Sequence, residues 1–209
     1  RYNVHDLENI ADLVESYGAV LWSVFFLVPT GRGRVQDMID ADTCEKILQW
    51  LYGQAQVRSF GVKATAAPHY RRVCIQSRSS KSAGGPQPGF RAGVRSPRAA
   101  AAVNDGNGFV FISHIGDVYP SGFLPVNAGN IRQAPLADIY RNAEVFRTLR
   151  NPSLFKGKCG VCEFRTICGG SRARAFAVTG DYLESDPGCS YIPEKLRENG
   201  RTDCWSRTV

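Results

Sequence analysis

The chain of 209 residues is 43% hydrophobic and 22% charged, which is typical of a globular protein with one large domain or two small ones. Its longest apolar run, residues 19–29, is interrupted by Ser23 and is shorter than the roughly 18 residues of a membrane span, which argues against a membrane protein. The formal net charge is +7, but the basic segment 71–98 has few aromatic neighbours and lacks a nucleic-acid-binding motif, so we expect a solvated loop, with attraction of an anionic ligand as the alternative.

The first predicted element is an amphipathic helix over residues 5–17. No charged segment followed by an apolar core is present here, so the sequence shows no secretory signal and predicts a cytoplasmic protein. Gly18 follows the last turn of the helix, a common way for a helix to end. The apolar residues that recur at helical spacing are Leu7, Ile10, Ala11 and Val14.

Strands and helices alternate from there to residue 76. Residues 20–28 form an apolar run that is typical of a parallel strand covered on both faces. A second helix is expected to begin near Asp42, where Glu45 completes a capping-box pattern, and residues 61–67 form another strand. The order α-β-α-β predicts an α/β fold with a parallel sheet.

Two short segments after these strands are candidate ligand sites, because parallel sheets bind ligands beyond the carboxyl ends of their strands. Thr30, Gly31 and Arg32 follow the first strand; the glycine permits close backbone approach, and the arginine offers a partner for a carboxylate. His69 and Tyr70 follow the next strand and are candidates for contact with a substrate. The alternatives are a simple turn with a surface arginine and a structural histidine.

The rest of the chain is less regular. Residues 77–108 are rich in glycine, serine, proline and arginine and predict a long loop or linker. Two apolar segments flank residues 114–116 and predict a β-hairpin with a glycine turn, in which His114 is exposed. A short helix is expected over residues 172–178. Pro135 opens a longer helix, in which five apolar side chains are expected to point inward: Leu136, Ile139, Tyr140, Ala143 and Leu149.

Four cysteines near the C-terminus, Cys159, Cys162, Cys168 and Cys189, have the spacing C-x2-C-x5-C-x20-C. Thiolates this close together usually hold metal, and four of them can complete the ligand set of an iron–sulfur cubane. Zinc is the main alternative, although structural zinc modules generally bring two close pairs of ligands, whereas this segment has one close pair and no nearby histidine. Unligated cysteines or disulfides are the remaining alternative.

The residues around these cysteines fit a metal site. Glycines allow tight turns that bring backbone amides toward sulfur, where they tune a metal centre. Arginines would offset the negative charge of a tetrathiolate cluster, unless they form a solvated helix face. The glycines are Gly160, Gly169 and Gly170, and the arginines are Arg165, Arg172 and Arg174.

The three other cysteines are scattered along the chain. Cys44 falls on the apolar face of a predicted helix and Cys74 in a predicted strand, so both are expected to be buried small hydrophobic residues. Cys204 has no evident partner. Without a secretory signal, a disulfide framework is a weak interpretation.

Several segments resemble radical SAM enzymes with a SPASM or twitch extension. CGVCEFRTICGGSRARAFAVTGDYLESDPGC, residues 159–189, resembles their auxiliary-cluster region, in particular that of the subgroup similar to haem-biosynthesis enzymes. GFVFISHIGDVYPSGFLPVNAGNIR resembles the hairpin that opens the extension, and LWSVFFLVPTGRGR and VKATAAPHYRR resemble the last strands of the partial (β/α)6 barrel. The resemblance implies the C-terminal part of that barrel in residues 1–76, a linker in residues 77–108, and a small α+β SPASM/twitch-like domain in residues 109–209.

The sequence departs from the family pattern at two places in this extension. Ser121 stands where full SPASM domains have a cysteine in the hairpin. Arg172 stands where the usual C-x2-C-x5-C-x3-C run has its fourth cysteine. The resemblance therefore implies one auxiliary 4Fe-4S cluster, with these ligands: Cys159, Cys162, Cys168 and Cys189.

A third departure concerns the C-x3-C-x2-C motif, which holds the cluster that binds S-adenosylmethionine in the family and is missing here. Because the sequence also begins with arginine in place of methionine, we expect the C-terminal part of a longer enzyme, with loss of the catalytic half as the alternative. The chain alone is then expected to generate no radical. In the full-length protein, the resemblance implies S-adenosylmethionine near Thr30, Gly31 and Arg32, substrate near His69 and Tyr70, and a second 4Fe-4S cluster.

The function implied by the resemblance is oxidation of an organic metabolite by a radical SAM oxidoreductase, with a tetrapyrrole as the candidate substrate. A peptide-maturing radical SAM/SPASM enzyme and a stand-alone iron–sulfur electron-transfer protein are the alternatives. Cysteine at all four ligand positions favours electron transfer over substrate ligation, and a ferredoxin or flavodoxin is the expected electron donor. Neither a nucleic acid nor a membrane is expected as a partner.

Overall fold

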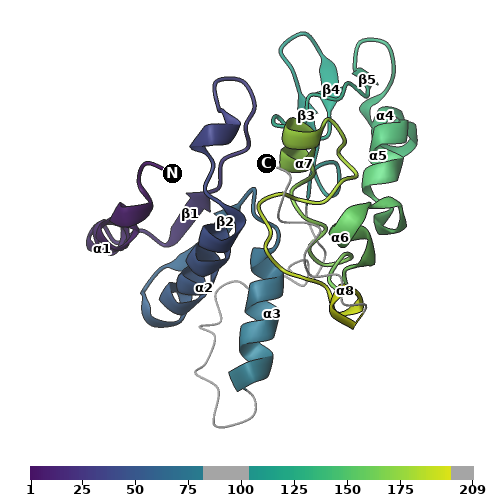
Figure 1. Ribbon diagram of the computed structural model, residues 1–209. Helices are drawn as coiled ribbons and strands as arrows, with labels where there is room; N and C mark the ends of the chain where they lie inside the picture. Colours follow the sequence, from purple (N-terminus) through teal and green to yellow (C-terminus); the bar gives the residue numbers. More distant parts are fainter. Residues whose placement is uncertain (82–103, 199–209) are drawn as a thin grey trace.

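The computed structural model describes residues 1–81 and 104–198, and its first part alternates helices with two strands (Figure 1). This order confirms the predicted α-β-α-β alternation, and the last helix reaches into the segment that was expected to be a loop. The elements are α1 (Leu7–Ser16), β1 (Leu21–Phe25), α2 (Ala41–Val57), β2 (Gly61–Thr65) and α3 (Tyr70–Lys81), with 3-10 turns at Val4–Asp6 and Val35–Asp37.

The sheet of the first part consists, within the described residues, of β1 and β2. The two strands pair in parallel, with Leu21 opposite Gly61 and Phe25 opposite Thr65, which confirms the predicted parallel pairing. α2 packs against β2 and α3, and its Leu48 is fully buried. The prediction that the first strand is covered on both faces is wrong, because Leu21 and Phe25 are 54% and 53% exposed.

The start of α2 differs from the prediction. Its N-cap is Asp40, whose carboxylate accepts a hydrogen bond from the backbone N–H of Thr43 at 2.7 Å. The predicted capping box of Asp42 and Glu45 is therefore wrong. Glu45 instead forms an ion pair with Arg72 of α3, so its side chain points toward the neighbouring helix.

Two of the scattered cysteines belong to the core of the first part. Cys44 is buried as predicted. Cys74 lies in α3, so the predicted strand at this position is wrong. Tyr70, Val73 and Cys74 follow helical spacing, and all three pack on the core that contains Cys44. Cys204 lies outside the described residues.

The C-terminal part begins with a small antiparallel sheet in the strand order β3-β4-β5. β3 and β4 form the predicted hairpin. In its turn, His114 is exposed as expected. Gly116 has a φ of 94°, a backbone conformation that favours glycine. Short helices follow the sheet. The elements are β3 (Phe111–Ile112), β4 (Asp117–Tyr119), β5 (Gly129–Asn130), α4 (Leu136–Asn142), α5 (Glu144–Leu149), a 3-10 turn (Pro152–Leu154), α6 (Gly157–Val161), α7 (Arg172–Thr179) and α8 (Glu194–Glu198).

The single helix predicted after Pro135 is in fact two helices. Ala143 adopts φ −60° and ψ 136°, an extended conformation that separates α4 from α5. The break lets α5 turn its own apolar face to the core. Of the side chains expected to point inward, Ile139 and Leu149 are buried, whereas Leu136 is exposed. The short helix predicted over residues 172–178 is confirmed as α7.

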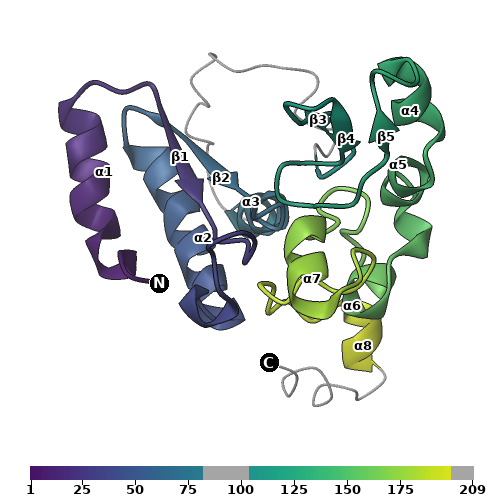
Figure 2. The same ribbon diagram turned by 90° about the horizontal axis from the view of Figure 1, so that it is seen from above.

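The two parts of the chain pack against each other, with α3 between them (Figure 2). Val28 and Ala66, which follow β1 and β2, pack against the core of the C-terminal part. Arg71 of α3 donates a hydrogen bond to the carbonyl oxygen of Ile167 at 3.3 Å. Segments that follow the parallel strands therefore meet the region that contains the four cysteines.

The predicted domain boundaries at residues 76 and 108 stay predictions, and most of the predicted linker lies outside the described residues. Among the helices of residues 1–81 and 104–198, none is long and apolar enough to cross a lipid bilayer.

Candidate metal centre

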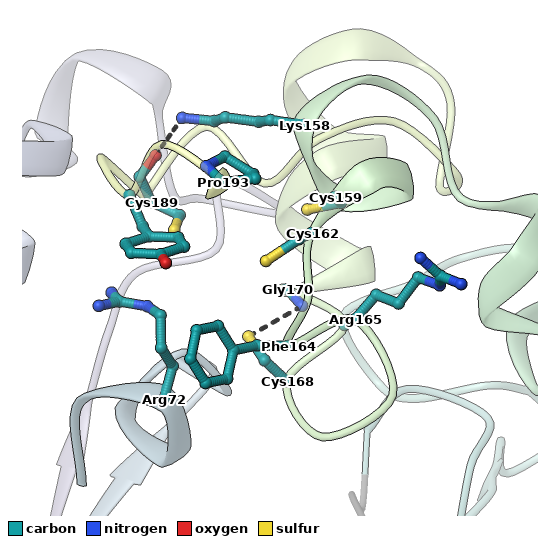
Figure 3. A pocket seen from close by; sticks show the side chains of 12 residues that line it. Arg72, Lys158, Cys159, Cys162, Phe164, Arg165, Cys168, Gly170, Cys189 and Pro193 are labelled. Atoms are coloured by element: carbon teal, nitrogen blue, oxygen red, sulfur yellow. Dashed lines mark hydrogen bonds between the residues drawn. The ribbon is translucent and has the colours of Figure 1, made fainter. Parts of the chain in front are cut away.

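Cys159, Cys162, Cys168 and Cys189 line one pocket in the C-terminal part. Cys159 lies in α6 and Cys162 at its C-terminal end, Cys168 precedes α7, and Cys189 follows a turn after α7. About 400 Å³ of space in and around the pocket is free of protein atoms, and this figure includes open solvent. Figure 3 shows the side chains of Cys159, Cys162 and Cys168 directed into the same space. The structure thus brings together the four thiols that the sequence grouped by spacing.

Two consecutive glycines shape the chain between Cys168 and α7. Gly169 and Gly170 each have a φ of 67°, in the left-handed region that favours glycine. A Cβ atom on Gly170 would lie 2.6 Å from Nη2 of Arg172 and 3.2 Å from Sγ of Cys159. The backbone at Gly170 therefore approaches the thiol more closely than a residue with a side chain would allow.

Three hydrogen-bond donors point at sulfur atoms in this pocket. The backbone N–H of Gly170 lies 3.4 Å from Sγ of Cys168. The backbone N–H of Asp186 and Nη2 of Arg172 each lie 3.4 Å from Sγ of Cys159. Donors of this kind stabilise a thiolate and tune a metal bound to it. The surroundings of Cys159 and Cys168 therefore fit thiolate ligands.

Burial affects the protonation of these thiols. It raises the pKa of Cys162 and of Cys189 to about 11 each, and it also raises the pKa of Cys168 above its ordinary value. Without a metal, these three side chains are therefore neutral thiols at pH 7 and can be buried at little cost. Metal binding must displace their protons.

A cluster and a single metal ion place different demands on the four thiols. A tetrahedral zinc site holds its sulfur ligands about 2.3 Å from one ion. In the described part of the chain, no three His, Cys, Asp or Glu side chains converge closely enough to hold one metal ion. The cysteine ligands of a cubane bind separate irons, so they need only surround a common space. Four thiols that line one pocket meet this requirement.

Behind the residues that line the pocket, α7 and the turn at Asp186 form a layer that contacts Sγ of Cys159 and is called the inner wall here. Asp186 is fully buried and accepts hydrogen bonds from Nε and Nη2 of Arg174 at 2.8 and 2.9 Å. The backbone N–H groups of Ser171 and Gly188 donate to the same carboxylate at 2.7 and 2.9 Å. Burial alone would raise the pKa of Asp186, but the charge and hydrogen bonds of Arg174 outweigh it and hold that pKa well below its usual range.

Arg172 is the second buried arginine of the inner wall. Its Nη1 donates to the carbonyl oxygens of Tyr182 and Glu184 at 3.1 and 2.6 Å, and its guanidinium stacks on the ring of Phe155 at 4.7 Å. Arg172 and Arg174 are 1% and 2% exposed, so the alternative of a solvated helix face is wrong for both.

The opposite side of the pocket, called the outer wall, consists of Arg72, Phe164 and Tyr191. The Arg72 guanidinium, which pairs with Glu45, lies 4.6 Å from the centre of the Tyr191 ring. Phe164 meets Tyr191 edge-on, with 5.7 Å between ring centres, and the Tyr191 hydroxyl donates to Glu163. Because Arg72 belongs to α3, the first part of the chain contributes to the pocket.

Other residues singled out in the sequence lie away from the thiols. Thr30, Gly31 and Arg32 form the loop after β1, are not among the residues that line the pocket, and the last two are exposed. Gly31 has a φ of 60° and open space around its Cα, so its backbone conformation explains the glycine. Arg165 differs from these residues because it lines the pocket, but it is exposed, and Figure 3 shows its side chain extending away from the thiols. Ser121 is buried, and its hydroxyl oxygen accepts a hydrogen bond from the backbone N–H of Phe123.

His69 and Tyr70 are also outside the residues that line the pocket. His69 is fully buried, with Nε2 3.3 Å from Sγ of Cys44 and Nδ1 3.8 Å from the Asp186 carboxylate. Burial lowers the pKa of His69 to about 4, so the ring is neutral at pH 7. Tyr70 is half-buried at the start of α3, where burial raises the pKa of its hydroxyl. Their contact with a substrate stays a prediction.

Sequence reasoning missed three residues that shape the pocket. Asp186 and Tyr191 stand three and two positions from Cys189. This closeness in sequence to a candidate ligand could have identified both as neighbours of the metal site. Arg72 lies in α3, far from the cysteines in the chain. Nothing in its sequence neighbourhood separates it from the other arginines of the basic segment, so only the packing of α3 reveals it.

Comparison with known families finds a recognised domain that contains part of this pocket. The model of the SPASM family, described as an iron–sulfur cluster-binding domain, matches residues 104–184. The match includes Cys159, Cys162 and Cys168 and ends before Cys189. It agrees with the resemblance seen in the sequence and with a cluster in preference to zinc.

Curated proteins related to this chain include three differently named enzymes. The AdoMet-dependent heme synthase of Methanosarcina barkeri is 44% identical over 92% of this chain and 54% of its own length. The Pre-heme d1 synthase of Dinoroseobacter shibae is 33% identical over 40% of the chain and 22% of its own length. The PqqA peptide cyclase of Bradyrhizobium diazoefficiens is 44% identical over 28% of the chain and 16% of its own length. The chain spans about half the length of the heme synthase that it matches.

Proposed function

Because the chain is related to radical SAM enzymes and carries their SPASM iron–sulfur domain, we propose that it holds the single auxiliary 4Fe-4S cluster of such an enzyme. The observation that carries the proposal is the pocket that four thiols line together, with hydrogen-bond donors directed at two of their sulfur atoms. The proposed ligands are Cys159, Cys162, Cys168 and Cys189.

When bound, the cluster would supply one-electron chemistry next to the reaction centre of the enzyme. The cysteines occupy all four ligand positions, which supports electron transfer over direct ligation of a substrate. Gly170 and Asp186 hold sulfur atoms in place through their backbone N–H groups. Phe164 and Tyr191 cover the pocket with aromatic rings, which limits the access of water and oxygen.

The complete enzyme would use S-adenosylmethionine and a second 4Fe-4S cluster, and it would draw electrons from a donor such as ferredoxin or flavodoxin. In this proposal β1, β2 and their helices are the last part of a partial (β/α)6 barrel. Thr30, Gly31 and Arg32 would then lie near S-adenosylmethionine, and His69 and Tyr70 would act at the substrate side. The loop after β1 is exposed at Gly31 and Arg32, so S-adenosylmethionine could reach these residues. His69 is fully buried, so it would position neighbouring residues and would not touch the substrate directly.

A tetrapyrrole is the proposed substrate class. The support is the extent of similarity: the heme synthase of M. barkeri matches 92% of the chain, both before and within the SPASM domain, whereas the peptide cyclase matches 28%. Peptide maturation is the second candidate, favoured by the 44% identity of that shorter match. Anaerobic binding of a porphyrin and of a peptide by the full-length enzyme would distinguish the two.

The test of the cluster is anaerobic reconstitution with iron and sulfide, followed by metal and labile-sulfide analysis. We expect about four irons and four sulfides per chain, and loss of both in Cys162→Ala. Cys74→Ala is the matched control, since Cys74 is a half-buried cysteine of α3 outside the pocket, and it should retain the full iron content. Stoichiometric zinc without labile sulfide, or equal iron in both variants, would contradict the proposal.

A further inference from the structure

Arg172 is a buried cation that lacks a carboxylate partner among the described residues. Its side chain is 1% exposed, and no Asp or Glu in residues 1–81 or 104–198 lies within ion-pair distance of it. Its charge acts on Asp181 only from farther away, and Asp181 already pairs with Lys156. A buried charge without compensation is costly, so such a residue normally indicates an anion nearby. The question is which group in the folded protein supplies that negative charge.

The contacts of Arg172 identify a single group that can become an anion. Its Nη1 meets the carbonyl oxygens of Tyr182 and Glu184, its Nε lies 3.4 Å from the carbonyl oxygen of Gly170, and its plane stacks on Phe155. All of these groups are neutral. The remaining contact is Nη2 to Sγ of Cys159 at 3.4 Å, and a metal-bound thiolate there would carry negative charge.

The two other arginines described in the walls, Arg174 and Arg72, differ from Arg172 in this respect. Arg174 is compensated by Asp186, and Arg72 by Glu45. In each of these pairs the carboxylate offsets part of the effect of the arginine on the thiols. Arg172 combines burial and direct contact with a ligand sulfur, and no carboxylate of the described residues lies within ion-pair distance of it. It also stands where the resembled cysteine run has its fourth cysteine, so this chain has a cation in place of a further ligand.

We propose that Arg172 is the counter-cation of the cluster and a positioning residue for Cys159, and that its charge raises the one-electron reduction potential of the cluster. This inference rests on the proposed function. A positive charge fixed in a low-dielectric site favours the state with the larger negative charge, which is the reduced state. The side chain is held by three carbonyl oxygens and a ring, so it needs no rearrangement when the electron arrives.

The test is a redox titration of reconstituted protein, monitored by electron paramagnetic resonance, for the wild type, Arg172→Met and Arg172→Lys. At the wild-type midpoint potential, Arg172→Met should show a ratio of reduced to oxidised cluster that is about tenfold lower. For a one-electron couple, this corresponds to a shift of about 59 mV to lower potential. Arg172→Lys keeps the charge but loses the planar fork, so its shift should be in the same direction and about threefold.

Arg150→Met is the matched control. Arg150 also donates to two backbone carbonyl oxygens, those of Tyr140 and Arg141, and stacks on an aromatic ring at 4.7 Å, but these contacts involve none of the four cysteines. It should leave the potential unchanged. An unchanged potential in an Arg172→Met protein that holds four irons, or an equal shift in the control, overturns the inference.

Iron analysis of the same samples separates this inference from the proposed function. A wild type without iron and sulfide overturns the proposed function, whereas a loaded wild type with variants of unchanged potential overturns the role of Arg172 alone. If Arg172→Met does not fold, Arg172→Gln carries the test, because glutamine removes the charge but still donates hydrogen bonds. A potential equal to or above that of the wild type in a glutamine variant that holds four irons would then refute the proposal.

Discussion

The inner and outer walls of the thiol pocket are built in different ways. The inner wall is buried and polar: Arg172 donates to Sγ of Cys159, and Arg174 donates to Asp186, three residues before Cys189. The outer wall consists of aromatic rings and of Arg72, which reaches the pocket from the first part of the chain. The inner wall therefore determines where the sulfur atoms lie, whereas the outer wall determines what reaches them.

The largest effect is expected from the buried ion pair of the inner wall. Asp186→Asn leaves the Arg174 charge buried without a partner, so we expect a loss of about 3–5 kcal/mol in the free energy of unfolding, measured by urea denaturation. Asp181→Asn is the control, because it breaks an ion pair with Lys156 that is partly exposed to solvent and should change stability far less. Equal losses of unfolding free energy in the two variants would show that the buried Asp186–Arg174 pair contributes no more to stability than the exposed Asp181–Lys156 pair.

A smaller effect is expected at the glycine next to the thiols. Gly170→Ala adds a methyl group against Arg172 and Cys159 and keeps a left-handed backbone, so we expect a loss of about 2–4 kcal/mol and a lower iron content after reconstitution. Gly180→Ala isolates the backbone part, because Gly180 has a φ of 78° with open space around it. Gly180→Ala should lower the free energy of unfolding by about 1 kcal/mol and retain iron. A larger loss in Gly180→Ala than in Gly170→Ala would contradict the close packing of Gly170 against Arg172 and Cys159.

The outer wall should affect access more than stability. Tyr191→Leu removes the ring between Arg72 and Phe164, and we expect about 1 kcal/mol of destabilisation. We also expect faster loss of cluster absorbance in air, because oxygen and water meet less cover. Tyr191→Phe keeps the ring and loses only the hydroxyl, so its cluster should decay at nearly the wild-type rate. Equal decay in the wild type and Tyr191→Leu would show that the ring does not cover the cluster.

The same contrast explains what the sequence could predict. The cysteine spacing, the α-β-α-β order and the hairpin follow from local patterns, and the structure agrees with each. Part of the inner wall could be predicted, because Arg172 and Arg174 stand in the cysteine segment. The burial of these two arginines and their hydrogen-bond partners are visible only in the structure. Helical spacing was the overlooked signal at Cys74, whose short apolar run looked like a strand.

The outer wall was beyond sequence reasoning. Arg72 meets Tyr191 because α3 packs beside the C-terminal part, and a tertiary contact of this kind leaves no periodic pattern in either segment. The uncovered face of β1 has a similar explanation: its apolar run predicts burial, but Leu21 and Phe25 have no covering layer in the described residues. A pattern specifies which side chains prefer burial and leaves open which element covers them.

The contacts of the inner wall also bear on the order in which the protein matures. Arg172 and Asp186 reach Cys159 across 13 and 27 residues, whereas Arg174 reaches the carbonyl oxygen of Leu27 across 147 residues. Contacts between neighbours in sequence lose less chain entropy and form sooner. We therefore expect the cysteine segment to acquire iron before α3 docks beside it, so that cluster insertion precedes closure. Hydrogen-exchange protection that develops around Cys159 before it develops in α3 would show this order.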